Sequence, residues 1–183
     1  PRALVEKLNE LINKFIVEKY TAPAPNYYKW DSATQAPSSE LNATYSDDGI
    51  RLVDGKQSHV NGSTGVYSAW QKTEDGKIEI TLDCTNLAPR DTFKAYFAAN
   101  SIWGVKAPAN MEVSYSNDNK TFTKINSEVT KRAIPDVGEI SDNVWSRWEY
   151  IVKSPEVISA RYFKFTIYFD GGFIWIDEIE ATN

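Results

Sequence analysis

Strict alternation of apolar and polar residues, with no helical pattern between the alternating segments, is the strongest constraint on how this chain folds. In residues 77–84, KIEITLDC, every second side chain is apolar or a cysteine. The same period recurs in the following segments: 92–98, 111–116, 161–169 and 173–182. Successive side chains of a strand point to opposite faces, so this pattern is typical of half-buried strands. Shorter candidates, including WSRWEYIVK and TFTKI, raise the total to about eight strands.

Strands that follow one another without helices pair antiparallel. We therefore predict an all-β protein, an antiparallel jelly-roll β-sandwich of about eight strands preceded by one amphipathic helix. The helix is predicted over residues 2–20, where the leucines, isoleucines and Phe15 share one face. The segment TAPAPN ends it, because Pro23 and Pro25 favour extended chain.

This pattern divides the chain into a helix with a proline-containing linker, 1–25, and a sandwich domain, 26–183. The apolar stripe of the helix has two possible covers, its own sandwich or a preceding domain of a longer polypeptide. A start at Pro1 rather than at methionine indicates a piece of a longer chain. Both interpretations of the helix remain open from the sequence.

Composition excludes several classes of partner. The net charge is −5, and the only adjacent basic pair is Lys131-Arg132, so we expect no nucleic-acid binding. No apolar run approaches the ~20 residues that span a bilayer, so we expect no membrane span. The single cysteine, Cys84, rules out an internal disulfide and is predicted to be a buried thiol.

Nothing in the sequence indicates catalysis. His59 is the only histidine, so a Ser/His/Asp arrangement would have to include it. It lies in the polar segment KQSHVNGSTG, where a solvated loop histidine is the simpler interpretation. Neither a phosphate-binding glycine loop nor a zinc ligand set is present. We expect a domain that is not itself an enzyme.

In the last segment, GGFIWIDEIEAT, a row of apolar residues that we expect to be buried is followed by the carboxylates of Asp177 and Glu178. Strict alternation would place Glu178 on the face of Ile174 and Ile176. A carboxylate there is costly unless it is paired. One hypothesis is a cation held between this strand and the segment RLVDGKQS at 51–58. The alternative is that Glu178 pairs with a Lys, an Arg or backbone N–H groups.

Three stretches resemble coagulation-factor-type C, or discoidin-like, domains, which have a galactose-binding-like sandwich. LVDGKQSHVNGSTGVYSAW is similar to their Leu-x-Asp-Gly…Thr-x-Trp element. GVKAPANMEVSYSNDNKTF is similar to their Gly-x-x-x-Pro…Val-x-x-Ser-x-Asp-Gly-x-x-Phe stretch, and FIWIDEIEA resembles their closing strand. The resemblance covers about residues 40–183. This part of the chain is also similar to bacterial carbohydrate-binding modules.

The resemblance implies a structural calcium ion between the Asp-Gly loop and the last strand. Carboxylate oxygen would come from Asp54 and Glu178, hydroxyl oxygen from Ser68, and backbone carbonyl oxygen from near Leu52 and Lys56. Such an all-oxygen set is what calcium takes in proteins. The loop between Gly55 and Ser68 is longer here than is usual in the family.

The family's sugar-binding pattern is only partly present. Relatives often carry an Arg after Tyr-x-Pro, and the matching stretch YFAANSIWGVKAP has Ala99 at that position. Trp103 in this loop is our first candidate, because a solvent-facing indole is an apolar platform for a sugar. Asn100 and Lys106 are its candidate polar neighbours.

Two further aromatic groups are candidates, although packing is the usual role of each. In WSRW, Trp145 and Arg147 share one strand face, and Trp148 faces the other way, toward the core. Tyr27, Tyr28 and Trp30 follow the linker.

We expect a non-catalytic carbohydrate-binding module of a larger glycan-acting protein, secreted or on the cell surface. Its partners would be a glycan and the neighbouring domains of its polypeptide, among them a glycoside hydrolase or similar enzyme. The alternative is an architectural or protein-interaction, adhesin-like domain, because a fold does not dictate function. An exposed Trp103 beside polar side chains favours sugar, and a Trp103 buried under the helix favours architecture.

Overall fold

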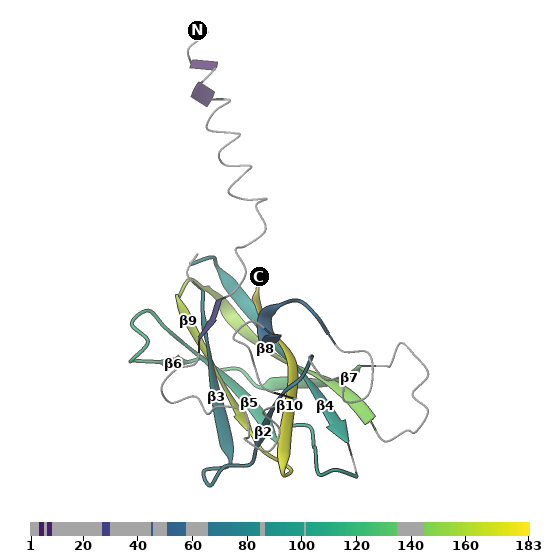
Figure 1. Ribbon diagram of the computed structural model, residues 1–183. Coiled ribbons are helices and arrows are strands. Elements are labelled where there is room, and N and C mark those ends of the chain that lie inside the picture. The colour runs from purple at the N-terminus through teal and green to yellow at the C-terminus, as the bar shows by residue number, and fades with distance from the viewer. Residues whose placement is uncertain are drawn as a thin grey trace.

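Two antiparallel sheets packed face to face form the molecule (Figure 1). The structure is a computed structural model, and it describes residues 4, 5, 7, 8, 27–29, 45, 51–57, 66–84, 87–100, 102–134 and 145–183. Its elements are β1 (Tyr27–Lys29), the short 3₁₀ helix η1 (Arg51–Val53), β2 (Ser68–Gln71), β3 (Lys77–Asp83), β4 (Arg90–Asn100), β5 (Asn110–Ser116), β6 (Thr123–Lys124), β7 (Val129–Ile134), β8 (Trp145–Ile158), β9 (Tyr162–Tyr168) and β10 (Phe173–Thr182).

Each sheet contains five of these strands. The first sheet has the order β1-β3-β9-β5-β6, and the second has the order β2-β10-β4-β8-β7. Every pairing between these strands is antiparallel. The predicted all-β antiparallel sandwich is therefore confirmed, with strands built from the alternating segments of the sequence.

The apolar rows of the two sheets meet in one core. Phe93 of β4 packs against Phe163 of β9 with 4.9 Å between ring centroids. Leu52 of η1 is fully buried in the same cluster, so η1 adds a side chain to the core. Cys84 is buried there too, and burial raises the pKa of its thiol to about 11, so it stays an unreactive thiol near neutral pH.

The sequence pattern did not predict three of the strands, β1, β2 and β7, and β7 is the longest of them. Its middle residues, including Lys131 and Arg132, are exposed, so no alternating apolar row marks it. It lies at the edge of the second sheet and pairs only with β8. Charged side chains on an edge strand also discourage pairing with another chain.

A β-bulge at Asp177 changes the alternation of β10. Ile176 pairs with Phe97 and Glu178 with Tyr96, so Asp177 is an extra residue between two consecutive partners on β4. Ile176 and Ile179 both belong to the core cluster, although strict alternation would separate them. The prediction that Glu178 shares a face with Ile174 and Ile176 is therefore wrong. Glu178 lies on the outer face of the second sheet, the face away from the core.

The predicted N-terminal helix lies almost entirely outside the described residues. Of its apolar residues, Leu4, Val5 and Leu8 are described, and they are exposed. The helix and the boundary at residue 25 therefore stay predictions. None of the described helical residues belongs to a helix long and apolar enough to cross a bilayer.

Deleting residues 1–20 is expected to leave the sandwich folded. Among the described residues, the main core cluster is assembled from side chains between Leu52 and Ala181, and Leu4, Val5 and Leu8 of the helix are exposed. Thermal unfolding followed by circular dichroism should stay cooperative, with a transition close to that of the full chain. Loss of cooperative unfolding in the truncated protein would show that the helix completes the core.

Candidate functional site

The outer face of the second sheet carries a second cluster of aromatic side chains. Tyr45, Tyr67 and Trp175 are buried there, together with small residues of β2 and β4. Trp175 lies 4.3 Å from Tyr45 and 5.8 Å from Tyr67, measured between ring centroids. Trp145 of β8 packs against this cluster and is only partly buried. The cluster therefore extends from a buried base toward the surface.

Trp103 is the exposed end of this aromatic row. It lies in the connection between β4 and β5, and 61% of its surface is exposed. Its ring meets Trp145 edge to face, with centroids 5.8 Å apart and planes at 79°. Trp145 in turn lies 5.1 Å from Trp175. We call Trp103, Trp145 and Trp175 the aromatic row. It is an apolar platform anchored in the sheet.

Asn100 fixes the backbone that carries Trp103. Its side-chain oxygen accepts hydrogen bonds from the N–H groups of Ile102, at 2.9 Å, and Trp103, at 3.0 Å. Its own N–H donates to the carbonyl of Val105 at 2.7 Å. Asn100 was predicted to contact sugar. The structure places it almost fully buried, with its amide oxygen engaged by the loop.

Two glycines let the Trp103 loop approach the turn before β10. Gly104 has a φ of +71°, a conformation that L side chains rarely adopt. Its carbonyl accepts a hydrogen bond from the N–H of Gly172 at 3.0 Å. A Cβ on Gly171 would lie 2.6 Å from that same carbonyl oxygen, so only glycine fits there. These contacts hold Trp103 on a fixed backbone.

The other candidate sugar residues occupy different environments. Lys106 is exposed and lies 3.5 Å from Asp170 in an ion pair at the surface. Arg147, by contrast, is 6% exposed and pairs with Asp177, which is fully buried, at 2.5 Å. Trp148 packs against the core, as predicted. The structure thus brings Trp103 and Trp145 together and holds Arg147 within the protein.

The Asp-Gly loop meets the last strand, as the calcium hypothesis requires. The N–H of Gly55 donates a hydrogen bond to Glu178 Oε2 at 2.9 Å. Asp54 is adjacent, and its carboxylate accepts hydrogen bonds from the backbone N–H of Lys56 at 2.9 Å and from its ammonium at 3.1 Å. Residues more than a hundred positions apart in the sequence therefore share one site.

Glu178 is a buried carboxyl group among other acids. It is 3% exposed. Its pKa is raised to about 8, chiefly by burial and also by the charges of Asp54, Glu180 and Asp177, while the hydrogen bond from Gly55 acts in the opposite direction. A carboxylate in such a place is unfavourable without a positive partner. The environment favours either a proton or a cation at Glu178.

The remaining predicted ligands flank this point. Leu52 lies in η1, two residues before Asp54, and Lys56 lies two residues after Asp54. Ser68 begins β2, is buried, and pairs with Ile176 just before the bulge. In the part of the chain that the structure describes, no three His, Cys, Asp or Glu side chains gather into a metal-binding group. A calcium site here would have to draw on backbone and hydroxyl oxygens, as the predicted set does.

A buried polar network beside Glu178 was not predicted. The hydroxyl of Tyr96 lies 3.2 Å from Glu149 and 3.4 Å from Glu180. Glu149 is buried and pairs with Lys94, at 3.4 Å, and with Arg132. In WSRWEYIVK, Glu149 shares a strand face with Trp145 and Arg147. The alternation of this segment could therefore have indicated that Glu149 lies on the outer face of the sheet.

Comparisons with known proteins define the class of fold. No protein-family model matches the chain, and no curated protein matches it by sequence. Among solved structures, module CpGH89CBM32-5 of Clostridium perfringens, in complex with GalNAc-β-1,3-galactose, is 17% identical, covers 82% of this chain and 92% of its own, and gives a TM-score of 0.50. A structure from the Streptococcus pneumoniae β-galactosidase BgaA is 13% identical, covers 85% of this chain and 96% of its own, and gives 0.51.

These neighbours show that the chain shares the β-sandwich fold of the CpGH89CBM32-5 module and of the BgaA structure. The resemblance inferred from the three sequence motifs is confirmed at the level of the fold. The candidate site residues are assigned from the geometry of this chain and not from these neighbours.

The metal-free protein is expected to lose stability as the pH rises. The pKa of Glu178 is raised to about 8 in the folded state, against about 4.3 in an unfolded chain. Between these values the folded state holds a proton that the unfolded state has released, so the free energy of unfolding falls as pH increases. The stabilisation is fully present at a pH below the pKa of the unfolded state and is lost at a pH above the pKa of the folded state. Thermal unfolding in chelator, from about pH 4 to about pH 9, measures this slope.

Glu178→Gln should remove that part of the pH dependence, because a neutral amide replaces the titrating group. Glu74→Gln, at an exposed turn residue, is the matched control and should behave as the unmodified protein does. Equal slopes for all three proteins would contradict the assignment.

Proposed function

We propose that this chain is a non-catalytic carbohydrate-binding module of a larger, secreted or cell-surface, glycan-acting protein. The observation that carries the proposal is the exposure of Trp103 at the end of the aromatic row. An indole held on a fixed loop offers a flat apolar surface to the C–H face of a pyranose. Loops positioned by a rigid scaffold are the usual place for such sites.

Polar groups beside Trp103 would orient the sugar. Lys106, in the same connection as Trp103, and Asp170, in the connection between β9 and β10, form an exposed ion pair that can donate to and accept from hydroxyl groups. Gly104, next to Trp103, adds no side chain that would obstruct the ring face. The neighbour bound to GalNAc-β-1,3-galactose supports testing galactosides first. A few placed polar groups around an apolar surface are typical of small-ligand sites.

The role in the parent protein would be targeting. Modules of this type bind weakly, and a tether raises the effective concentration of the attached domain at the glycan. The Streptococcus pneumoniae neighbour comes from a β-galactosidase, which supports an enzyme as the attached partner. The competing role is protein interaction, which the exposed Ile102 beside Trp103 would also suit.

We also propose a structural calcium ion between the Asp-Gly loop and β10. The buried carboxyl of Glu178, its contact with Gly55 and the adjacent Asp54 support this assignment. Asp54 and Glu178 would supply charge, Ser68 a hydroxyl, and the backbone near Leu52 and Lys56 carbonyl oxygens. The ion would neutralise Glu178 and join η1 to the sheet.

Trp103→Ala is expected to leave the fold intact and to weaken glycan binding at least tenfold, about 1.4 kcal/mol. The residue is mostly exposed, so its removal takes little from the core. A glycan array, followed by calorimetry on the strongest galactoside hit, measures the loss.

Two variants serve as controls for this measurement. Ile102→Ala removes the exposed apolar neighbour and should retain sugar binding, whereas a protein partner would lose affinity with both variants. Trp175→Ala truncates the buried base of the aromatic row and should destabilise the protein by about 3 to 5 kcal/mol. Unchanged glycan affinity in folded Trp103→Ala would place the sugar elsewhere.

Chelation is expected to lower the melting temperature, since a ligand bound only by the folded state stabilises it by about 2.7 kcal/mol at a hundredfold excess over Kd. Asp54→Ala should abolish the response to added calcium, and Glu74→Ala, an exposed acid on a turn, should keep it. Metal analysis of the purified protein accompanies the experiment. Identical melting curves for metal-free and calcium-loaded protein would rule out the ion.

A further inference from the structure

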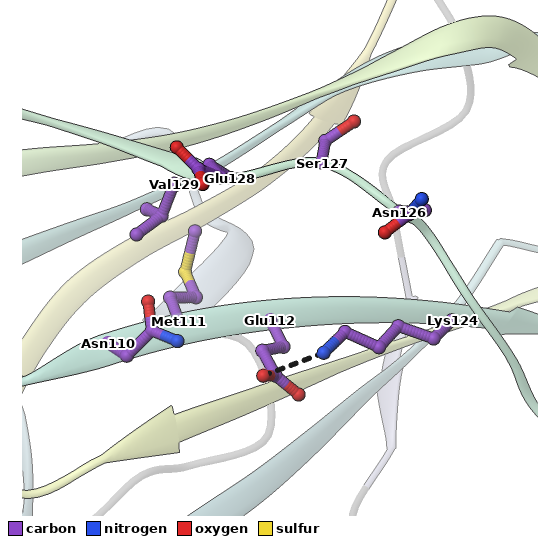
Figure 2. Close-up of a pocket in the computed structure, with 8 residues that line it drawn as sticks. All are labelled: Asn110, Met111, Glu112, Lys124, Asn126, Ser127, Glu128 and Val129. Carbon is purple, nitrogen blue, oxygen red and sulfur yellow. Dashed lines mark ion pairs between the residues drawn. The ribbon is translucent and has the colours of Figure 1, made fainter.

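A groove on the side of the sandwich lies apart from both sites described above. It runs between β5 and the connection that leads from β6 into β7 (Figure 2). β9 pairs with the whole of β5 on one side, whereas β6 pairs with it on the other side only at Ser114 and Tyr115, so the start of β5 has no described strand on that second side. The connection, residues 125–128, crosses from the first sheet to the second at this point. The groove is therefore bounded by both sheets.

The groove has a volume of about 470 Å³. Pockets of roughly 300 to 1,000 Å³ are typical for small ligands. Val129 of β7 is half-buried and supplies apolar surface in the groove, and the neighbouring Met111 of β5 is almost fully buried in the core (Figure 2). A ligand with one apolar face has a surface to pack against here.

One wall of the groove is already ordered. Glu112 accepts a hydrogen bond from the Tyr168 hydroxyl at 3.2 Å and forms an ion pair with Lys124 at 2.8 Å. The hydrogen bond and charge of Glu112 raise the pKa of the Lys124 ammonium, which keeps it protonated. Each carboxylate oxygen retains a lone pair, because each takes only one of these partners. The wall thus offers acceptors beside a fixed cation.

The opposite wall is polar, and its side chains form no hydrogen bonds with the residues that the structure describes. Asn126, Ser127 and Glu128 follow one another along the connection, and Asn110 lies at the start of β5. Nothing in the described part of the chain bonds to these four side chains. Amides and a hydroxyl both donate and accept, and a carboxylate accepts. Their hydrogen-bonding capacity is available to a ligand.

From this lining we infer a second carbohydrate site, one that takes a single neutral pyranose residue of a glycan. A pyranose combines hydroxyl groups, which need adjacent donors and acceptors, with a C–H face that suits the exposed part of Val129. The inference extends the proposed glycan binding to a surface that contains no residue of the aromatic row. Two weak sites on one module would bind one polysaccharide more tightly than either alone.

The charges of the groove argue against a metal ion. Glu112 is already engaged by Lys124 and Tyr168, and the Lys124 ammonium would repel a cation. That leaves Glu128 as the one carboxylate without an ionic partner among the residues that line the groove. One carboxylate is a poor site for a divalent ion, which takes six or more oxygens.

The test is a nuclear magnetic resonance titration of the isotope-labelled full chain with D-galactose, N-acetyl-D-glucosamine and D-mannose, each added separately. We expect at least one sugar to shift the amide resonances of Glu112 and of residues 126–129. The shifts should persist in Trp103→Ala. They should weaken at least about tenfold in apparent affinity in the double variant Asn126→Ala, Glu128→Gln. Both substituted side chains are exposed, so the fold is retained.

Glu74→Gln is the matched control and should leave the shifts unchanged. Shifts confined to Trp103 and its loop would overturn the groove site and leave the proposed function standing. Shifts confined to the groove would support it and move sugar binding away from Trp103. The groove site also fails if no sugar perturbs it, or if the double variant binds as the unmodified chain does.

Discussion

Asp177 and Arg147 form an ion pair that is almost completely removed from water, and the outer face of the second sheet is organised around it. The pair is possible because the bulge in β10 places an extra residue opposite β4. An unpaired charge at this depth would be strongly unfavourable, so each member constrains the other. Arg147 lies on β8 two residues after Trp145, and Asp177 directly precedes Glu178. The bulge therefore sets the positions of both candidate sites.

The two sites on this face differ in how they are stabilised. The aromatic row begins in a buried cluster and reaches the surface at Trp103, so packing holds it and a fixed loop presents it. The Glu178 site depends on charge, because its carboxyl is buried beside other acids. A calcium ion would neutralise the charge of Glu178 and would join η1 to β10. The first site would bind sugar, and the second would maintain the scaffold.

The groove beside β5 adds a third surface with a different chemistry. None of its described lining residues is aromatic, and its polar groups come from β5, β6 and the connection between the sheets rather than from loops at the end of the sandwich. A module with an aromatic platform and a polar groove would contact an extended glycan at two points. Such an arrangement suits a tethered domain, in which weak contacts add up on a polymeric ligand.

The sequence by itself determined the architecture, because alternation in segments such as 77–84 and 162–168 reports which side chains face a core. It also indicated that Trp148 faces the core while Trp145 faces away, and that Trp103 lies in a loop. It did not predict β7, whose exposed side chains leave no apolar row, nor the groove beside it. The tertiary structure alone decided the face of Glu178 and the burial of Arg147. A β-bulge depends on how two strands pair with each other. The alternation within one strand does not show how its partner strand is aligned with it.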